Sequence, residues 1–295
     1  MSDPSNTAPP ELLTIRQIAE FRNTVYRHYS EKGRDLPWRR THDPYRILVS
    51  EIMLQQTQVD RVIDKYEQFL AFFPDFRSLA EASLRAVLSA WQGLGYNRRA
   101  LALQRTAQRV VTEYEGELPD SPEELQKLPG VGPATAGALA AFAFERPAVF
   151  IETNIRRVFL HFFFAGKAGV QDREIAPLVD QTLDRERIRE WYYALMDYGA
   201  MQKKVEQNPN RRSAHYHRQA PFHDSDRQVR GLILKILLES PDLAEKDLVK
   251  AVGKRGPRVR TITGRLVEEG LLERTGERVH IASSVTCSTD VRAVK

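Results

Sequence analysis

The sequence predicts an all-α fold: a bundle of short helices followed by a small C-terminal winged helix-turn-helix unit. From Leu13 to about Phe222, apolar residues recur at helical spacing between short breaks of proline, glycine and aspartate. From about Ser225, three more helical segments precede two short alternating runs on either side of Thr275 and Gly276. Three helices and a terminal hairpin are the layout of a winged helix-turn-helix.

The bundle is expected to contain helices of ordinary length joined by short loops. Asp43 and Pro44 supply a capping residue and a first-turn proline for a helix that continues to Phe73, just before Pro74. Further helices are expected at 78–91, 98–114, 121–128, 134–144, 154–164, 174–184 and 190–201.

The C-terminal unit is expected to have helices at 227–239, 243–252 and 259–270, and a hairpin over 271–281. Its basic residues outnumber its acidic ones, by 12 to 8 between Arg227 and His280. Such a unit can place its third helix in a DNA major groove, or it can serve as a dimerisation or packing module. The expected organisation is a bundle domain at 13–207, a basic linker at 208–225, a winged-helix domain at 226–282, and disordered tails at 1–12 and 283–295.

Length and composition allow one or two domains with a sizeable core. The chain has 295 residues, of which 42% are hydrophobic and 9% aromatic, so a wholly disordered chain is excluded. The 44 basic and 39 acidic residues give a net charge of +5, which suits an acidic partner such as nucleic acid. The sequence contains neither a signal peptide nor an apolar run of about 18 residues, so we expect a cytoplasmic protein without a membrane partner.

Cysteine and histidine usage argues against a metal or disulfide framework. The single cysteine, Cys287, excludes an internal disulfide and a four-cysteine iron–sulfur site. His215 and His217 lie in a basic stretch without a nearby set of ligands, which favours a linker or phosphate-binding role. We therefore expect no metal and no cofactor.

A helix, a tight turn and a second helix are expected around 121–144. Gly130 and Gly132 would let the backbone approach a ligand closely, and the free amides at the start of the second helix suit an anion such as a DNA phosphate. A plain turn is the alternative, as is a solvated lysine for Lys127. The candidate phosphate-binding residues are Lys127, Gly130, Val131, Gly132 and Ala134.

Glu51 is the first candidate for a catalytic carboxyl. It lies in a stretch, 47–54, that is apolar nearly all round, as expected of a buried helix. Burial raises the pKa of a glutamate, which would keep a proton available for donation near neutral pH. A structural Glu–Arg pair is the alternative.

Glu152 is the second candidate. An apolar run delivers it to the start of a helix near Thr153 or Asn154, where the helix dipole and free amides stabilise an ionised carboxylate. An ordinary capping acid is the alternative. One carboxyl that stays protonated and one that stays charged can together break a glycosidic bond through an oxocarbenium-like state.

Five short segments carry a family resemblance: 36–40 (LPWRR), 50–59 (SEIMLQQTQV), 93–96 (GLGY), 128–132 (LPGVG) and 196–200 (MDYGA). Together they resemble the catalytic domain of the MutY adenine DNA glycosylases, members of the helix-hairpin-helix DNA glycosylase superfamily. The similarity covers roughly residues 13–201, and the segment 50–59 is its most specific part.

The resemblance implies roles for individual residues. Glu51 would be the general acid that protonates the base, Glu152 falls at the position of the family's catalytic aspartate, and Asn154 falls at that of a supporting asparagine. The residues expected to enter the duplex or to border the base pocket are Trp38, Arg39, Gln55, Gln56, Tyr96 and Tyr193.

The chain also differs from the family pattern. Glu152 has one methylene more than aspartate, Asn97 replaces a second tyrosine, and Tyr193 stands where a Glu or Gln helps to read adenine. The family's iron–sulfur cysteines are absent after 196–200, where the basic stretch 203–218 would supply DNA contacts. Members that act opposite 8-oxoguanine carry a Nudix-like C-terminal domain, and here a winged helix is expected instead.

The resemblance implies a monofunctional DNA glycosylase, because Ala134 replaces the lysine with which endonuclease III forms a Schiff base. The expected substrate is double-stranded DNA with a lesion or mismatch, with adenine as the first base to be considered and a monomer as the acting form. A thymine or uracil mismatch glycosylase is the alternative within the class. A non-catalytic DNA-binding or lesion-sensing protein is the alternative outside it, and the two retained carboxyls favour the enzyme.

Overall fold

The structure is a computed structural model that describes residues 12–205, 208–218 and 221–283. The chain divides into two compact units. The first contains residues 1–47, 120–126 and 131–218, and the second contains 48–119, 127–130 and 219–295. The tails expected at 1–12 and 283–295 fall almost entirely outside the described residues, and Cys287 does so as well.

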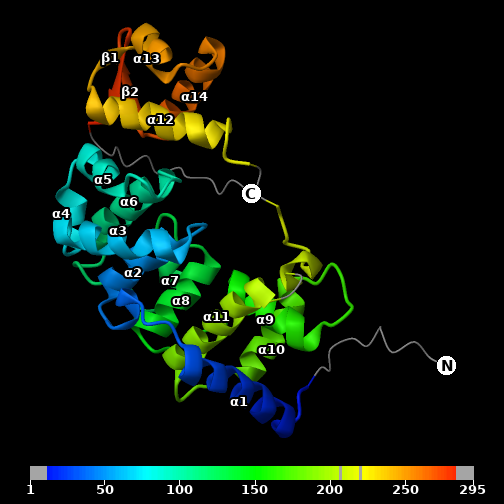
Figure 1. Cartoon of the computed structure of the whole chain (residues 1–295). Helices are drawn as coiled ribbons and strands as arrows, with labels where there is room; N and C mark the ends of the chain where they lie inside the picture. Colours follow the sequence, from blue (N-terminus) through cyan, green and yellow to red (C-terminus); the bar gives the residue numbers. More distant parts are fainter. Residues whose placement is uncertain (1–11, 206–207, 219–220, 284–295) are drawn as a thin grey trace. The chain divides into compact units, whose positions relative to one another are not determined.

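The predicted all-α class is confirmed, because helices make up most of the described chain and its strands form one small sheet (Figure 1). The helix α2 (Pro44–Leu54) begins in the first unit and ends in the second. The other elements of the first unit are α1 (Ile15–Lys32), the 3-10 turn η1 (Pro37–Arg39), α7 (Pro122–Leu125), α8 (Pro133–Ala143), α9 (Thr153–Phe163), α10 (Asp172–Thr182), α11 (Ile188–Val205) and the 3-10 turn η2 (Pro209–Arg212).

Aromatic side chains between α1, α9 and α11 form the core of the first unit. The ring of Phe21 lies edge-on to four others at centroid distances of 5.0–5.7 Å. Edge-to-face contact is favoured because the positive edge of one ring meets the negative face of the next. The four partners of Phe21 are Phe159, Phe162, Phe163 and Trp191.

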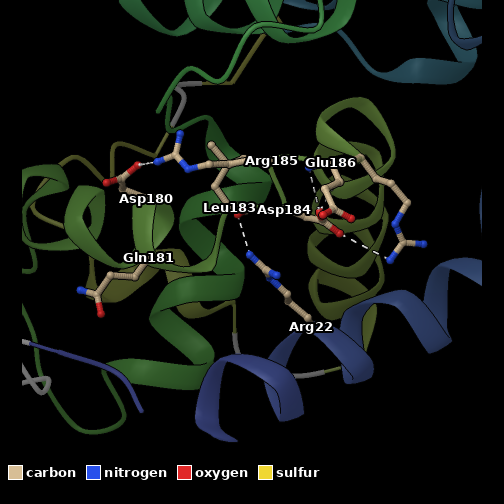
Figure 2. A pocket seen from close by; sticks show the side chains of 8 residues that line it. Arg22, Asp180, Gln181, Leu183, Asp184, Arg185 and Glu186 are labelled. Atoms are coloured by element: carbon tan, nitrogen blue, oxygen red, sulfur yellow. Dashed lines mark hydrogen bonds and ion pairs between the residues drawn. The ribbon is translucent and has the colours of Figure 1, made fainter. Parts of the chain in front are cut away.

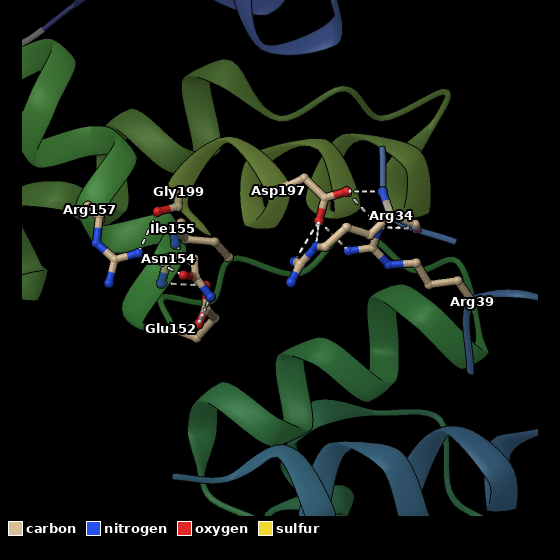
Figure 3. Close-up of polar contacts among 8 residues, drawn as sticks. All are labelled: Arg34, Arg39, Glu152, Asn154, Ile155, Arg157, Asp197 and Gly199. Carbon is tan, nitrogen blue, oxygen red and sulfur yellow. Dashed lines mark hydrogen bonds and ion pairs between the residues drawn. The ribbon is translucent and has the colours of Figure 1, made fainter. Parts of the chain in front are cut away.

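A buried ion network ties the segment after α1 to α11 (Figure 3). Asp197 has a side chain that is 2% exposed, and its carboxylate accepts from the guanidinium groups of Arg34 and Arg39 at 2.6–2.9 Å. Burial alone would raise the pKa of Asp197, but the hydrogen bonds and charges of these arginines outweigh burial and hold the pKa below its usual value of 3.8.

The first elements of the second unit are α3 (Val59–Phe72), α4 (Phe76–Glu81), α5 (Leu84–Trp91) and α6 (Arg98–Glu113). The single helices predicted over 44–73 and 78–91 are therefore wrong. Between α2 and α3 the backbone of Gln56 is left-handed, at φ 54°, a conformation that an α-helix does not contain. Between α4 and α5, Ser83 starts a new helix by accepting from the N–H of Ala86 at 3.2 Å.

The buried side chain of Arg99, on α6, holds the turn between α2 and α3. Burial lowers the pKa of Arg99 to about 10, which leaves the guanidinium charged at neutral pH. It donates at 2.5–3.3 Å to five backbone carbonyls and one hydroxyl, those of Ile52, Met53, Gln55, Leu94, Gly95 and Thr57.

The C-terminal part of the second unit has the order helix, strand, helix, helix, strand, strand (Figure 1). Its antiparallel sheet has the strand order β1-β3-β2, and the two-residue β1 is too short to show an alternation in the sequence. Helices and sheet share a core that includes Ile233, Ile262 and Leu271. The elements are α12 (Asp226–Glu239), β1 (Leu243–Ala244), α13 (Glu245–Val252), α14 (Gly256–Glu268), β2 (Leu272–Thr275) and β3 (Arg278–Ile281).

Arg85 of α5 connects this C-terminal part to the earlier helices of the same unit. Its guanidinium donates to the carbonyls of Leu237 and Leu238 at 2.9 and 2.8 Å. The last turn of a helix leaves carbonyls without intrahelical donors, and a cation there also complements the helix dipole. Arg85 therefore caps α12 from a neighbouring helix.

The segment expected as a linker begins with ordered contacts in the first unit. Arg212, at the end of η2, donates to the carbonyls of Leu160 and Phe164 at 2.8 Å each. The next residue, Ser213, forms an isolated bridge with Val170. Residues 208–214 are therefore fixed to the end of α9 and to the loop that follows it.

Replacing Asp197 with Asn should destabilise the protein by about 3–5 kcal/mol at pH 7, because Arg39, 7% exposed, would lose its counter-charge. The pKa of Asp197 is lower in the folded state, so this stabilisation is present above the unfolded pKa and is lost as the pH falls through the folded one. Urea unfolding of wild type and Asp197→Asn from pH 7 to below pH 3.8 measures both effects. If the difference in unfolding free energy between wild type and Asp197→Asn does not shrink as the pH falls, the stabilising role of the Asp197 carboxylate is contradicted.

Replacing Arg99 with Met should lower the free energy of unfolding by about 3 kcal/mol or more, because several carbonyls lose a donor at a cost of about 1–3 kcal/mol each. Arg77→Met, at an exposed position on α4, is the matched control and should change stability by no more than about 0.5 kcal/mol. Urea unfolding of the two variants makes the comparison. Equal stabilities would show that Arg99 does not hold the turn.

Candidate functional site

The expected site residues fall into local groups within each unit. Glu152 and Asn154 lie together at the start of α9 in the first unit, whereas Glu51 lies in the part of α2 that belongs to the second. The structure also brings together Arg39 and Tyr193 in the first unit. In the second unit, one cavity is lined by Gln55, Gln56 and Tyr96.

Glu152 is the N-cap of α9, and its carboxylate is held by three donors (Figure 3). Its Oε1 accepts from the backbone N–H groups of Asn154 and Ile155 at 2.7 and 2.8 Å. Its Oε2 accepts from the side-chain amide of Asn154 at 3.1 Å. These bonds satisfy amides that a helix start leaves without partners, and they fix the orientation of the carboxylate.

Burial sets the protonation preference of this carboxyl. Desolvation raises the pKa of Glu152 above its usual value of 4.5, and two backbone hydrogen bonds and the charges of Arg157 and Arg156 oppose the rise without cancelling it. The helix terminus is expected to favour the ionised form of Glu152, and this expected direction is wrong because desolvation is the stronger effect. Glu152 therefore keeps its proton to a higher pH than an exposed glutamate does.

Arg157 and Gly199, neither of which is among the expected site residues, fix the position of the Asn154 side chain and backbone beside Glu152. Arg157, 3% exposed, donates to Asn154 Oδ1 at 2.8 Å and also to the carbonyl of Gly199 (Figure 3). A Cβ at Gly199 would overlap the carbonyl of Asn154, so only glycine fits there. The sequence signal for this close approach is a glycine inside a predicted helix, whereas nothing local marks Arg157.

Trp38, Arg39 and Tyr193 are buried in the first unit. Trp38 is 5% exposed, and the Arg39 guanidinium that binds Asp197 also lies 4.5 Å from the centroid of the Tyr193 ring. The ring of Tyr193 also stacks on that of Phe142, with centroids 4.5 Å apart and planes 13° apart. The three side chains therefore have packing roles, whatever else they contact.

Glu51 is half-buried among apolar neighbours in α2. The residues on either side, Ser50 and Ile52, are each 1% exposed, as the sequence predicts for a helix that is apolar nearly all round. The side chain of Glu51 itself remains partly accessible, as a group that exchanges a proton with a ligand must be.

Gln55, Gln56 and Tyr96 meet at a cavity of about 780 Å³ that lies wholly within the second unit. Gln55 is fixed there by donating its side-chain amide to the carbonyl of Gly130 at 3.2 Å. Gln56 and Tyr96 both have positive φ, at 54° and 47°. Such strain costs on the order of 1–3 kcal/mol in non-glycine residues and clusters at functional sites.

Gly130 is required at the turn of the helix-hairpin-helix segment. It has φ 77°, and a Cβ at this position would lie 2.9 Å from that of Ala102 on α6. The carbonyl before it, that of Pro129, accepts from the Thr106 hydroxyl at 2.8 Å. Lys127 is exposed at its side chain, and its carbonyl accepts from a guanidinium at 2.6 Å. The turn is thus anchored by its carbonyls to α6.

The second helix of the motif, α8, starts at Pro133 with Gly132 as its N-cap. Glycine has no side chain to bond to the amides of the first turn, so an external anion can take that place. Val131 is buried, and Ala134 is half-buried in the first turn.

A polar hollow of about 560 Å³ lies beside the loop between α10 and α11 (Figure 2). Arg22 donates there to the carbonyls of Thr182 and Leu183 at 3.0 and 2.6 Å, and Arg185 pairs with Asp180 at 2.6 Å. Three basic and three acidic side chains line it, so the hollow has no excess of either charge and we assign it no role.

Within the described ranges, His, Cys, Asp and Glu side chains form no cluster of three that could hold a metal ion. His215, considered in the sequence as a possible ligand, lies 4.0 Å from a single carboxylate, that of Asp172. The part of the chain that the structure describes also contains no helix long and apolar enough to cross a membrane.

Residues 49–181 match the family model of the HhH-GPD superfamily base excision DNA repair protein. Among curated proteins, the adenine DNA glycosylase of Buchnera aphidicola subsp. Baizongia pistaciae (strain Bp) is 36% identical over 188 residues, which are 61% of this chain and 52% of that protein. The adenine DNA glycosylase of Homo sapiens is 36% identical over 198 residues, 63% of this chain and 36% of the relative.

The adenine DNA glycosylase of Mycobacterium tuberculosis (strain CDC 1551 / Oshkosh) is 36% identical over 204 residues, 68% of this chain and 64% of the relative. The chain therefore spans between 36% and 64% of the length of these three relatives.

Two solved structures share the fold. A thermostable thymine-DNA glycosylase matches with a TM-score of 0.57 and 26% identity, over 63% of this chain and 87% of its own. A trapped endonuclease III–DNA covalent intermediate matches with a TM-score of 0.57 and 21% identity, over 66% of this chain and 91% of its own. Residues 49–181, which carry Glu51, the hairpin and Glu152, therefore form a domain that matches the HhH-GPD superfamily of base excision DNA repair proteins, as the resemblance to the MutY enzymes implies.

Proposed function

We propose that the protein is a monofunctional DNA N-glycosylase that hydrolyses the bond between deoxyribose and a base flipped out of double-stranded DNA. The observation that carries the proposal is the Glu152 carboxylate, held by three hydrogen bonds at the start of α9 within a segment that matches a base excision repair family. The half-buried Glu51 supplies the second carboxyl that acid-assisted glycosidic cleavage requires.

The reaction divides its work between these two groups. Protonated Glu51 donates a proton to the leaving base, which departs with the electron pair of the N-glycosidic bond. The deoxyribose then carries an oxocarbenium-like positive charge, which ionised Glu152 stabilises. Water adds to the anomeric carbon and gives up a proton, leaving an abasic site.

Asn154 and Arg157 position the catalytic carboxylate. The side-chain amide of Asn154 bonds to Glu152, and its oxygen accepts from Arg157, so all three groups form one chain of hydrogen bonds. A geometry fixed before substrate arrives needs little reorganisation when charge develops on the sugar.

The hairpin is proposed to bind one DNA phosphate through the backbone at Gly130, Val131 and Gly132 and the start of α8. Lys127 adds a positive charge beside it. Ala134 has no amine with which to attack the sugar, which supports water as the nucleophile and a monofunctional reaction.

Adenine in a mismatch is the proposed substrate base, because the relatives reported above are adenine DNA glycosylases. Thymine is the second candidate. It is favoured by Tyr193, which stands where the MutY pattern has a Glu or Gln, and by the similarity to a thymine-DNA glycosylase. Uracil in a mismatch is a candidate base together with thymine.

The proposed partner is double-stranded DNA that contains a lesion or mismatch, bound by a monomer in the cytoplasm. The net charge of +5 supports a polyanionic partner. A protein that only senses lesions would not need two carboxyls in environments this different, which supports the enzyme over the non-catalytic alternative.

Single-turnover excision from duplexes with A opposite 8-oxoguanine, A·G, T·G or U·G tests the function, with alkali to cleave abasic sites. Glu51→Gln should slow excision by about 10²–10⁴-fold, because it removes the proton donor. Glu152→Gln should slow it by about 10²–10³-fold, because it removes the charge that stabilises the sugar. Glu81→Gln, at an exposed position on α4, is the control and should excise at the wild-type rate.

Excision of one base that both catalytic substitutions slow would establish the enzyme and name its base. Binding to every duplex without excision from any would favour the lesion-sensing alternative. An equal rate for wild type and Glu152→Gln would remove Glu152 from the mechanism.

The excision rate should fall on the acid side with a midpoint above pH 4.5, because Glu152 acts in its ionised form and burial raises its pKa. Arg156→Gln should move this midpoint to still higher pH, since the charge of Arg156 lowers the pKa of Glu152. A pH profile of the single-turnover rate for both proteins measures the shift. A midpoint at or below 4.5, or one that Arg156→Gln leaves in place, would contradict the assignment.

A further inference from the structure

The cavity of about 780 Å³ in the second unit lies between α12 and the loop that precedes α6. We call it the α12 groove and define it by Gln56, Tyr96, Phe222, Arg227, Arg230 and Lys235. Its volume is in the range of ligand sites, roughly 300–1,000 Å³. One wall is therefore formed by the C-terminal part of the chain and the other by the helices that precede it within the same unit.

The lining of the α12 groove is strongly positive, with six basic side chains and one acidic side chain, Glu269. Arg230 pairs with Glu269, and Arg98 lies 3.9 Å from the same carboxylate. Arg99 bonds to backbone carbonyls, which leave its charge uncompensated. Lys235 is exposed, 3.8 Å from the exposed Glu239. An excess of five positive charges around one concavity attracts a polyanion.

Aromatic side chains accompany these charges. The guanidinium of Arg227 lies 5.9 Å from the ring centroids of both Tyr96 and Phe222, and it donates to the Tyr96 hydroxyl at 3.0 Å. Phe222 is 60% exposed, which is unusual for so large an apolar side chain. Positive charge interleaved with accessible rings is the surface that binds a nucleic acid strand, since phosphates meet the cations and bases stack on the rings.

Acidic side chains lie against two of the three cations of α14, the third helix of the C-terminal part. Arg258 and Arg265 both pair with Asp226, at 2.8 and 3.7 Å. Just before the helix, Lys254 pairs with Asp224 at 3.0 Å. Two acids, Asp224 and Asp226, therefore lie against three of the five cations at and just before α14, whereas the six cations of the α12 groove have two acids beside them, Glu269 and Glu239.

We propose that the α12 groove binds the sugar–phosphate backbone of a DNA strand. This inference deepens the proposed function, on which it rests, by giving the C-terminal part of the chain a share of the substrate-binding surface through α12 and not through α14. Arg227 and Lys235 contact phosphates, and Phe222 provides a stacking surface for a base.

The test compares two double variants of the full chain by fluorescence anisotropy with a labelled, undamaged DNA duplex over a series of salt concentrations. Arg227→Gln with Lys235→Gln removes two cations from the groove. Arg255→Gln with Arg260→Gln removes two exposed cations at α14 and is the matched control. Each lost phosphate contact should reduce the slope of log affinity against log salt by about 0.9, so the groove pair should reduce it by about 1.8.

The groove pair should also weaken binding at low salt by about tenfold or more, and Lys235→Gln alone should lower the slope by about 0.9. The single variant keeps the test decisive, because an exposed lysine can be replaced without unfolding the protein, as circular dichroism will check. A slope unchanged in the groove variants, or one that only the α14 pair reduces, overturns the proposal.

Excision by the same proteins separates this proposal from the proposed function. Binding that depends on the groove, in a wild type that excises no base, would leave the groove assignment standing and overturn the glycosylase. If the wild type excises a base but the groove pair does not alter the salt dependence of binding, the glycosylase stands and the groove assignment is overturned. A wild type that binds no DNA would overturn both.

Discussion

The buried guanidinium of Arg99 is the constraint on which the second unit depends. Carbonyl groups converge on it from the end of α2 and from the loop before α6, where no helix supplies their donors. A planar cation with five N–H groups can serve many acceptors at fixed angles, which a lysine cannot do. One guanidinium thus holds both the backbone just after Glu51 and the backbone just before Tyr96. The precision of this part of the site comes from a residue with no proposed contact with substrate.

The first unit has a comparable constraint in Glu152, where two requirements oppose each other. The proposed chemistry uses the carboxylate, whereas burial favours the neutral acid. Amides at the start of α9 and the charge of Arg157 take the place that water has around an exposed carboxylate, but at fixed positions. The longer side chain, in place of the family's aspartate, still reaches two amides of the first turn, so the cap is preserved. The extra methylene changes only how far the negative charge lies from the end of the helix.

Features with local causes could be predicted from the sequence. Asp43 and Glu152 both begin helices because their side chains reach amides two and three residues later. The break at Gln56 and the burial of Arg39 could not be predicted, because they depend on Arg99 and Asp197. Arg99 lies 44 residues from Gln55 in the chain, and Asp197 lies 158 residues from Arg39. The expected direction of the Glu152 pKa shift is wrong for a related reason. Periodicity indicates which face of an element is buried, but not how strongly one carboxyl on it is desolvated.

The division of the chain into interleaved segments has a consequence for folding. The first unit joins residues 1–47 to 131–218, and in it the N–H of Leu13 bonds to the side chain of Gln181 across 168 residues. Such distant closures lose chain entropy before they gain contacts, which slows folding. During synthesis, α1 emerges long before its partners α9 and α11, and its apolar face around Phe21 lacks them until then. The nascent chain therefore presents the apolar face of an amphipathic helix for an extended period, which is the kind of transient exposure that chaperones cover in nascent proteins.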